Sequence, residues 1–573
     1  MARLKSKTIH GRKYWYVVES RRVGGKVKTI HRAYLGRAED LLDRLQQRQA
    51  TERLKSFSHG GVAVLLSLAE RLRLVELIDQ HLRPPRRSRP ARRLLSVGQT
   101  LLLAAIGRAL HPTSKRGWAD WAQTTTLGWL WRFDPRQIDS PFFWDQMDRL
   151  GVEALETIQA ELGRRVLREF GISPDSLFYD VTNYYTFIDS RNRRCHLPQR
   201  GKNKQKRYDL RQFQMGMLVA QDGWVPLLAK LYAGNRNDVS TFPEALEAIA
   251  RQCGALGLAP GAVTLVADKG NVSQKNWGLL DATAFGYVVS LTPSQHKDWA
   301  ARPLEAFTTC QVPEVGEMRL LRGQTPIAGR PRTVVVLDSP TLRDGQLRGL
   351  TQQLQPVLRA LTGLQDALRT ATRRRRREVI ERQVQGVLRN TPTVRRLVRY
   401  ELTERDGDSG FWRFDWWLDV ETYEHLRDRQ FGRRMLATSR DSWATEQIVA
   451  AYWRQAEAEL VFRAMKAPEC LALRPQYHWT DQKIEVHSFC CVVGYLLASL
   501  VRRQARAMGY PQDVTGLLTM LNGVRMVLRT DATGRPGRPR VQWQLEETDP
   551  EVLRFYQSLV HADYELGPTA PKP

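Results

Sequence analysis

Cysteine is scarce in this sequence of 573 residues, and its few cysteines form no pattern. There is no CxxC pair and no Cys/His cluster among the six, which are Cys195, Cys253, Cys310, Cys470, Cys490 and Cys491. Neither a zinc site nor a disulfide framework is therefore indicated, and a reducing cytoplasm is the expected compartment. Long hydrophobic runs are lacking too. The longest, residues 488–501, is shorter than the ~20 residues that span a bilayer, and the first residues contain no apolar signal core, so no membrane segment is expected.

Acidic residues are outnumbered in the chain. It contains 88 Lys and Arg against 60 Asp and Glu, which gives a net charge of +28 and a pI of about 10.2. Such an excess favours a polyanionic partner, and nucleic acid is the leading candidate because a membrane surface usually requires an amphipathic anchor as well. Charge alone does not separate DNA from RNA. The chain also exceeds the roughly 250 to 300 residues at which one core stops growing, so several domains or one elaborated core are expected.

The N-terminal third divides into a strand region and a helical region. Residues 13–35 predict two strands around Gly24 and Gly25, so residues 1–50 are interpreted as a β-hairpin region. From about residue 60 to 165 the hydrophobic period becomes helical, and we interpret residues 51–170 as a helical, DNA-binding region. A proline-broken linker there carries six arginines between Arg83 and Arg93. It is equally well read as a solvated connector or as a DNA-backbone contact.

The next segment has its elements in a definite order, which predicts the fold class. Strands are expected at residues 177–182, 212–220, 225–233, 262–267 and 286–291, with helices at 240–256 and 273–281. The second and third strands are joined by an Asp-Gly turn. Three antiparallel strands, helix, strand, helix, strand is the ribonuclease H-like order. We therefore expect an α/β fold in which residues 171–292 begin a core with a mixed five-stranded sheet flanked by helices.

The stretch from 293 to 435 interrupts this pattern and is interpreted as an inserted α+β domain. It contains a long polar helical segment around the five arginines Arg373 to Arg377, followed by aromatic-rich strands at 395–402 and 411–420. The arginine run is most simply a solvated helix face. Residues 436–510 are then expected to complete the core, and residues 511–573 form a C-terminal region.

Two aspartates and one glutamate are the candidate catalytic residues. Asp180 lies within the apolar strand Leu-Phe-Tyr-Asp-Val-Thr, where a carboxylate is costly unless it is paired or metal-bound. Asp268 follows the end of another strand, where ligands tend to bind in open sheets, although an Asp there is ordinarily a turn or a helix cap. Carboxylates from separate elements can hold two divalent cations that activate and stabilise the oxygens of a phosphodiester.

The third candidate, Glu459, lies on a helix predicted over residues 448–465. Five polar residues, Glu459 among them, are spaced at intervals of three, four, four and three residues, which places their side chains on a single helical face. They are Tyr452, Gln455, Glu459, Arg463 and Lys466. A carboxylate among phosphate-binding donors suits a site where DNA meets a metal. On periodicity alone, a salt-bridged surface helix explains this face equally well.

Several ordered motifs resemble those of one family. They are Phe178-Tyr-Asp-Val-Thr-Asn-Tyr-Tyr185, Gly201-Lys with the basic run up to Tyr208-Asp, Gly234-Asn-Arg-Asn-Asp238, Ala267-Asp-Lys-Gly-Asn271 with Ser273 and Asn276, Leu436-Ala-Thr438, the helix around Glu459, and Arg474-Pro-Gln-Tyr-His478. With these motifs, which extend over nearly the whole chain, the sequence resembles the bacterial DDE transposases of the insertion-sequence-4 superfamily, especially the insertion-sequence-1634 branch.

The resemblance implies a function and a set of site residues. It implies a ribonuclease H-like core with an insertion, in which Asp180, Asp268 and Glu459 hold two Mg²⁺ or Mn²⁺ ions that serve cleavage at element ends and strand transfer, by cut-and-paste. The family's Tyr-x2-Arg-x3-Glu-x6-Lys signature contacts end phosphate. Tyr452, Glu459 and Lys466 match it, but its arginine is replaced by Gln455. The hypothesis is that Arg463 on the same face substitutes for that arginine.

DNA contacts are expected from a basic run as well. Residues 191–207 contain eight Lys or Arg and are predicted to loop out beside Asp180; the contacts assigned are Lys202, Lys204, Lys206 and Arg207. The four aromatic residues Tyr184, Tyr185, Trp416 and Trp417 could stack on bases, but core packing is favoured for each. His478 and His487 are interpreted as structural.

The expected partner is double-stranded DNA, both the terminal inverted repeats and the target. Because two ends must be joined, a homodimer on DNA is expected. Two other functions remain open. One is a catalytically inactive or repurposed protein that only binds transposon ends, and the other is a nuclease that cuts without joining.

Overall fold

The computed structural model describes residues 2–23, 26–42, 52–84, 95–203, 206–268, 273–405, 407, 409–469, 471–474, 476–531 and 541–565. The chain folds into two units. Unit 1 comprises Met1–Gly151, Ala467–Ala472 and Val493–Pro573, and unit 2 comprises Val152–Lys466 and Leu473–Val492. The arginine-rich linker predicted between Arg83 and Arg93 lies largely outside the described residues.

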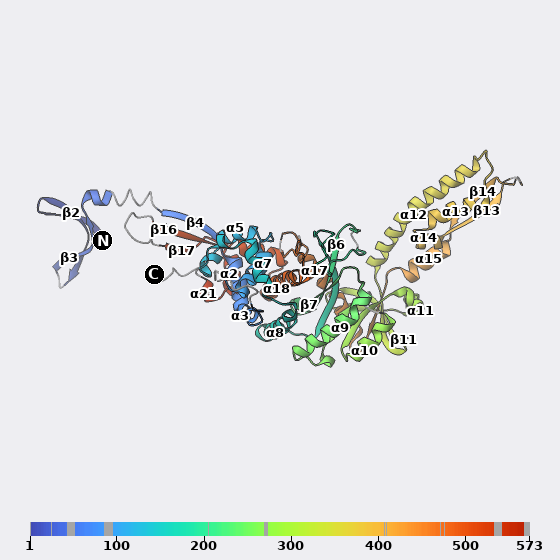
Figure 1. Cartoon of the computed structure of the whole chain (residues 1–573), viewed down its shortest axis with the longest axis horizontal. Helices are drawn as coiled ribbons and strands as arrows, with labels where there is room; N and C mark the ends of the chain where they lie inside the picture. The colour runs from blue at the N-terminus through green and yellow to red at the C-terminus, as the bar shows by residue number, and fades with distance from the viewer. Residues whose placement is uncertain are drawn as a thin grey trace. The chain divides into compact units, whose positions relative to one another are not determined.

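Unit 1 begins with a three-stranded antiparallel sheet of order β1-β2-β3, whose strands are Ala2–Ile9, Arg12–Val23 and Lys26–Gly36 (Figure 1). The predicted hairpin over residues 13–35 corresponds to β2 and β3. The first strand was not predicted, because its alternation of cations with Leu, Ser and Thr contains little of the apolar signal by which strands are recognised.

The rest of unit 1 is mainly helical, as its sequence period predicts. Its helices are α2 (Gly60–Arg71), α3 (Leu74–Asp79), α4 (Val97–Leu110), α5 (Gly117–Gln123), α6 (Leu127–Leu130), η1 (Pro135–Gln137), α7 (Ser140–Asp148), α19 (Val514–Asn522), α20 (Pro550–Leu559) and α21 (Ala562–Glu565). A second antiparallel sheet has the order β17-β16-β4, with strands Val541–Leu545, Arg525–Asp531 and Glu52–Ser58. Before α2, the buried His59 ring hydrogen-bonds to the hydroxyls of Thr126 and Tyr556, at 2.8 and 3.0 Å. These bonds join segments distant in sequence into one core.

Unit 2 is built on a mixed sheet of order β10-β11-β12-β15-β9-β8-β5-β6-β7. The five predicted strands are all present, as β5 (Ser176–Thr186), β6 (Arg211–Ala220), β7 (Val225–Ala233), β8 (Thr264–Ala267) and β9 (Gly286–Leu291). Among them, β8 pairs in parallel with both β5 and β9, whereas β5, β6 and β7 are antiparallel. This order is compatible with the ribonuclease H-like arrangement expected from the sequence.

The sheet is larger than the five strands predicted. It continues through β15 (Arg433–Thr438), β12 (Arg330–Asp338), β11 (Gly316–Ile327) and β10 (Thr308–Val312), each antiparallel to its neighbour. Residues 293–338 therefore include sheet strands rather than the beginning of an insertion. The prediction was wrong there because β10 and β11 are largely exposed and carry many polar residues, which weakens the strand signal.

Helices lie on both faces of this sheet. α8 (Val152–Phe170) and α9 (Asp238–Ala255) pack on β7, and α9 contacts α10 (Gln274–Ala282). α16 (Thr445–Trp453) packs on β8 and β9, and α17 (Gln455–Ala464) packs on β5. The shorter helices η2 (Pro260–Ala262), η4 (Pro293–Gln295), α11 (Lys297–Ala300) and η5 (Leu304–Ala306) connect the strands. Every residue of β8 and β9 is buried, as expected for a parallel pair that is covered on both faces.

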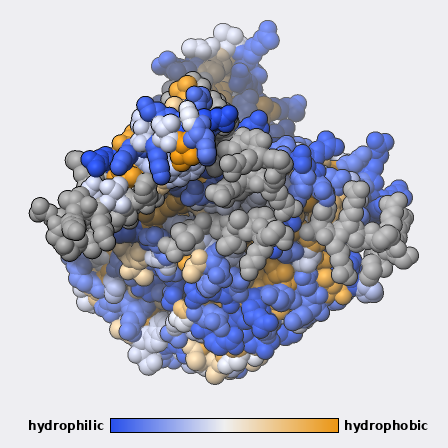
Figure 2. Space-filling view, turned by 90° about the vertical axis from the view of Figure 1, so that its left-hand side faces the viewer, coloured by the Kyte–Doolittle hydropathy of each residue, from blue (hydrophilic) through white to orange (hydrophobic). Residues whose placement is uncertain are grey.

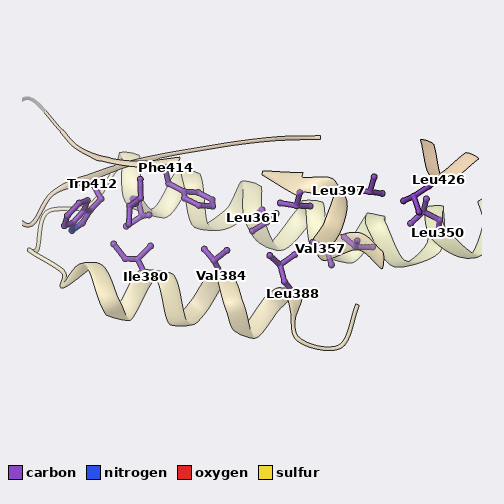
Figure 3. Close-up of a cluster of buried hydrophobic side chains, with 14 residues drawn as sticks. Leu350, Val357, Leu361, Ile380, Val384, Leu388, Leu397, Trp412, Phe414 and Leu426 are labelled. Carbon is purple, nitrogen blue, oxygen red and sulfur yellow. The ribbon is translucent and has the colours of Figure 1, made fainter. Parts of the chain in front are cut away.

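The insertion within unit 2 lies between β12 and β15. It contains α12 (Pro340–Arg369), α13 (Arg377–Leu388), α14 (Pro392–Leu397), the antiparallel pair β13 (Val398–Glu404) and β14 (Trp412–Leu418), α15 (Val420–His425) and the π-helical turn η6 (Leu426–Gln430). Figure 3 shows apolar side chains of these elements pointing toward one another, with Leu361, Ile380 and Phe414 among them. This region has its own hydrophobic core.

The arginine run lies elsewhere than predicted. Four of its five arginines, Arg373 to Arg376, occupy the exposed connection between α12 and α13, and Arg377 begins α13. The predicted helix therefore ends before them. Consecutive like charges repel along a helix, and a solvated connection relieves that repulsion.

α18 (Asp481–Ala507) is, among the described helices, the one long and apolar enough by length and composition to cross a membrane. The protein buries 94 % of its most apolar window. This burial is typical of a core helix. Outside the core, hydrophilic residues predominate on the face drawn in Figure 2, and the hydrophobic areas between them are small.

Candidate active site

Two carboxylates lie at neighbouring positions on the parallel strands β5 and β8 of the nine-stranded sheet. Tyr179 of β5 lies beside Ala267, the last residue of β8, so Asp180 and Asp268, which follow them, occupy neighbouring positions. Adjacent strands are about 4.8 Å apart, and neighbouring residues of parallel strands point to the same face. Asp180 and Asp268 are both half-buried. The two candidates that were weak separately in the sequence are therefore side by side.

Tyr452 of α16 is directed at the second of these acids. Its hydroxyl donates a hydrogen bond to Oδ1 of Asp268 at 3.3 Å. Burial raises the pKa of Tyr452 to about 12, so the phenol keeps its proton at neutral pH. The sequence assigned Tyr452 to DNA. In the structure this side chain is buried and hydrogen-bonds to a catalytic candidate.

Lys466, which follows α17, lies on the face of β5 that carries Asp180. Its ammonium donates a hydrogen bond to Oγ1 of Thr182 and lies 5.3 Å from the ring centre of Tyr184. Alternate residues of a strand share a face, so Asp180, Thr182 and Tyr184 point the same way. Tyr179 points the other way and contacts Phe242 of α9. A positive charge is thus fixed at Thr182, on the face of β5 that also carries Asp180.

Thr182 was given no role from the sequence, although it belongs to the motif around Asp180. The available signal was its position two residues after Asp180, which places both side chains on one face. The partner of Thr182 could not be inferred, because Lys466 is distant in sequence and its direction depends on how α17 packs on β5.

Glu459 and Arg463 are exposed on α17. They lie one helical turn apart, as the periodicity predicts. The same helix packs on β5, which brings Glu459 to the side of the sheet that holds Asp180. Nevertheless, within the part of the chain that the structure describes, no three His, Cys, Asp or Glu side chains are grouped closely enough to share a metal ion.

The helix predicted over residues 448–465 is broken. α16 ends at Trp453 and α17 begins at Gln455, with Arg454 between them. Arg454 forms a two-pronged ion pair with Glu314, at 2.8 and 2.9 Å. Glu314 belongs to neither of the strands that lead to Asp180 and Asp268. As a result the five predicted residues do not share one exposed face. Tyr452 and Gln455 are buried, and the side-chain oxygen of Gln455 accepts no hydrogen bond.

The basic run between β5 and β6 forms a folded loop. Its described cations are all exposed, namely Arg191, Arg193, Arg194, Arg200, Lys202, Lys206 and Arg207. The charges of two of them are neutralised by nearby carboxylates, since Arg191 forms an ion pair with Asp189 and Arg207 with Asp209. Hydrogen bonding from Arg207 lowers the pKa of Asp209 to about 2. Lys204, also predicted to contact DNA, lies outside the described residues.

Two residues that no sequence motif identified, Arg211 and Asp481, hold this loop by hydrogen bonds to its backbone. The guanidinium of Arg211 donates to three loop carbonyls, those of Asn192, Cys195 and Pro198, at 2.7 to 3.0 Å. The carboxylate of Asp481 accepts the backbone N–H groups of His196 and Leu197, each at 2.9 Å. The exposed cations therefore stand on a fixed scaffold, which lowers the entropic cost of binding an extended polyanion.

The aromatic candidates are mostly packing residues. Tyr184 and Tyr185 are buried, which confirms core packing for both, and Trp416 packs against the core of the insertion. Trp417 differs: it is 49 % exposed, so the packing interpretation was wrong for it. His478 and His487 are buried with their rings 4.5 Å apart, and His487 bonds to the carbonyl of Leu473.

Comparison with known proteins identifies a solved structure of low similarity. The sequence matches no family model and no curated protein. One solved structure with a similar arrangement is the cryo-EM structure of a piggyBac transposase synaptic complex with hairpin DNA. It is 9 % identical, covers 81 % of this chain and 80 % of that chain, and has a TM-score of 0.37. A likeness of this extent carries no argument about function.

Proposed function

We propose that this chain is a DDE-type DNA transposase that cuts DNA at the ends of its element and joins those ends to a target. The observation that carries the proposal is the pair Asp180, on β5, and Asp268, the residue after β8, which the parallel register of these two strands brings to neighbouring positions. Half-buried carboxylates side by side repel each other and are costly unless a cation or a proton separates them. A metal-binding function accounts for their placement.

The proposed core is ribonuclease H-like. Its support is the strand order β9-β8-β5-β6-β7, with three antiparallel strands followed by two parallel ones. The insertion is then assigned to residues 339–432, a shorter segment than the 293–435 expected from the sequence. This assignment leaves β15 and α17 to complete the core after the insertion.

The donor set fits hard divalent cations. Carboxylate oxygens are the ligands that Mg²⁺ and Mn²⁺ prefer, and two ions would be held by Asp180, Asp268 and Glu459. When bound, such ions supply an activated water or 3′-hydroxyl and stabilise the leaving oxygen. Tyr452 orients Asp268 by its hydrogen bond, and Lys466, bonded to Thr182, places positive charge on the face of β5 that carries Asp180. Glu459 is exposed and on the helix that packs on β5, so it is free to join the two aspartates when DNA is bound.

DNA is proposed to reach this site along the loop between β5 and β6. Lys202, Lys204, Lys206 and Arg207 are assigned to backbone phosphates, and the exposed Arg463 replaces the arginine that the resembled family has where this chain has Gln455. The net charge of +28 supports a polyanionic partner. A homodimer bringing two inverted repeats together, acting in the cytoplasm, completes the proposal.

The test compares two neighbouring glutamates. Purified protein with magnesium is mixed with DNA that carries the element's ends, and cleaved and joined products are separated on gels. Glu459→Gln is expected to lose cleavage while retaining DNA binding, whereas Glu457→Gln on the same helix is expected to cut normally. Equal loss in both variants, or in neither, contradicts the assignment of Glu459.

An end-binding protein without catalysis is the second candidate. What favours it is that Gln455 stands where the resembled signature has an arginine, so one phosphate contact of that signature is missing. Such a protein would bind the ends with the same affinity in magnesium as in a chelator and would release no cut strand. A nuclease would cut but yield no joined product.

A further inference from the structure

The N-terminal sheet β1-β2-β3 has two chemically different faces. Lys5 lies opposite Tyr16 and Lys7 opposite Tyr14, and on the other side of β2, Tyr16 lies opposite Tyr34. Opposite residues of antiparallel strands point to the same face. We call this surface the Lys–Tyr face; it comprises Arg3, Lys5, Lys7, Ile9, Arg12, Tyr14, Tyr16, Val18 and Tyr34, and Val18 is its one buried member.

The opposite face is less charged. It carries Leu4, Ser6, Thr8, Lys13, Trp15, Val17 and Glu19. Among the described side chains of residues 3–20, Glu19 is the only carboxylate, and it lies on this opposite face. Beyond these residues, the carboxylate of Asp40 lies near Tyr34. Within residues 3–20, four cations lie on the Lys–Tyr face, Arg3, Lys5, Lys7 and Arg12, and one, Lys13, lies on the opposite face.

The Lys–Tyr face is open to a ligand. Arg3, Lys5, Lys7 and Arg12 are exposed, and Tyr34 is 58 % exposed. The Tyr34 ring centre lies 5.2 Å from that of Tyr16 and 6.2 Å from that of Tyr14. Three phenol groups therefore lie together beside a row of cations on the outer strand β1.

The spacing of these groups suits duplex DNA. Residues rise about 3.4 Å along an antiparallel strand, so alternate cations recur every ~6.8 Å, which equals two steps of ~3.4 Å along one DNA strand. The major groove is about 12 Å wide and admits a two-stranded β-ribbon, so the pair β1 and β2, whose axes are about 4.8 Å apart, is narrow enough to enter it. Strands are known to read DNA in this groove.

We propose that the Lys–Tyr face binds double-stranded DNA, with Lys5 and Lys7 on phosphates and the tyrosine hydroxyls directed into the groove. The inference deepens the proposed function and rests on it for the choice of DNA as the polyanion. It adds a DNA-binding surface separate from the acidic residues and from the loop between β5 and β6.

The test measures binding of the full-length protein to labelled DNA duplexes, by fluorescence anisotropy, in a chelator and over a range of salt concentrations. Lys5→Gln with Lys7→Gln is expected to weaken binding and to reduce the slope of log affinity against log salt by about 0.9 for each phosphate that is no longer neutralised. Lys13→Gln is the matched control, because this lysine belongs to the same sheet but points to the other face.

Three results would overturn the inference. In the first, the Lys5→Gln, Lys7→Gln double variant binds DNA as tightly as the wild type. In the second, Lys13→Gln lowers the affinity and the salt slope as much as each of the two other lysine substitutions does. In the third, an RNA duplex or anionic vesicles displace the labelled DNA as well as unlabelled DNA does. Failure of the proposed function is distinguishable. If the wild type cuts no DNA but its binding still depends on Lys5 and Lys7, only the enzymatic proposal fails, whereas magnesium-dependent cutting with lysine-independent binding removes only this inference.

Discussion

Replacing Tyr452 by Phe removes one hydroxyl from the site and little else. That hydroxyl donates to Oδ1 of Asp268, and the raised pKa of Tyr452, about 12, ensures that it is protonated throughout the neutral range. Without it, Asp268 loses a group that fixes its orientation. We expect the variant to fold, because Phe fills nearly the same buried volume.

The size of the effect follows from the geometry. A hydrogen bond to a charged acceptor contributes about 1.5 to 3 kcal/mol when well formed. The Tyr452–Asp268 distance of 3.3 Å is long for a bond between two oxygens, so the lower end applies. About 1.4 kcal/mol corresponds to a roughly tenfold loss of rate. The loss should appear mainly at limiting magnesium, since a poorly oriented carboxylate weakens metal binding.

The assay follows the rate of end cleavage against magnesium concentration. Tyr179→Phe is the matched control: its hydroxyl pairs with that of Tyr232 at 3.2 Å, and it lies next to Asp180 but on the opposite face of β5. This control should leave the magnesium dependence unchanged. If Tyr452→Phe cuts like the wild type at limiting magnesium, or if both variants shift equally, Tyr452 does not position Asp268.

Two further predictions concern stability. Leu361→Ala, in the core of the insertion, should lower the free energy of unfolding by about 3 kcal/mol, whereas Leu418→Ala at the more exposed surface of β14 should cost less than about 1 kcal/mol in the same urea titration. Burial raises the pKa of Glu485 to about 7, above its ordinary value of 4.5, so the folded state loses up to roughly 3 kcal/mol as pH rises from about 4.5 through about 7. Glu485→Gln should abolish that part of the pH dependence; an unchanged profile would contradict it.

The strands at the centre of unit 2 could be predicted because their signal is local. β5, β6 and β7 combine apolar runs with an Asp-Gly turn, and Gly223 in that turn has the positive φ of 76° that glycine adopts without strain. The outer strands β10 and β11 carry polar, exposed side chains, and their pairing depends on partners far along the chain. No local pattern identifies such strands.

In the candidate site, too, the features with a local sequence signal could be predicted and those that depend on distant partners could not. The position of Asp180 in an apolar strand and that of Asp268 after another were evident from the sequence, and the parallel register places them together. Periodicity predicted one continuous helix for Tyr452, Glu459 and Lys466. The helix is interrupted at Arg454, whose guanidinium pairs with the distant Glu314, and Tyr452 is buried whereas Glu459 is exposed. Helical periodicity does not identify a partner so far along the chain.

The most direct test of the central claim is the effect of Asp180→Asn on magnesium-dependent cleavage of the element's ends. The substitution keeps the shape of the side chain and removes the charge that would hold the metal. We predict that cleavage is lost while binding of the same DNA in a chelator is retained. Cleavage undiminished in Asp180→Asn would contradict the proposed mechanism, because it would remove Asp180 from the reaction.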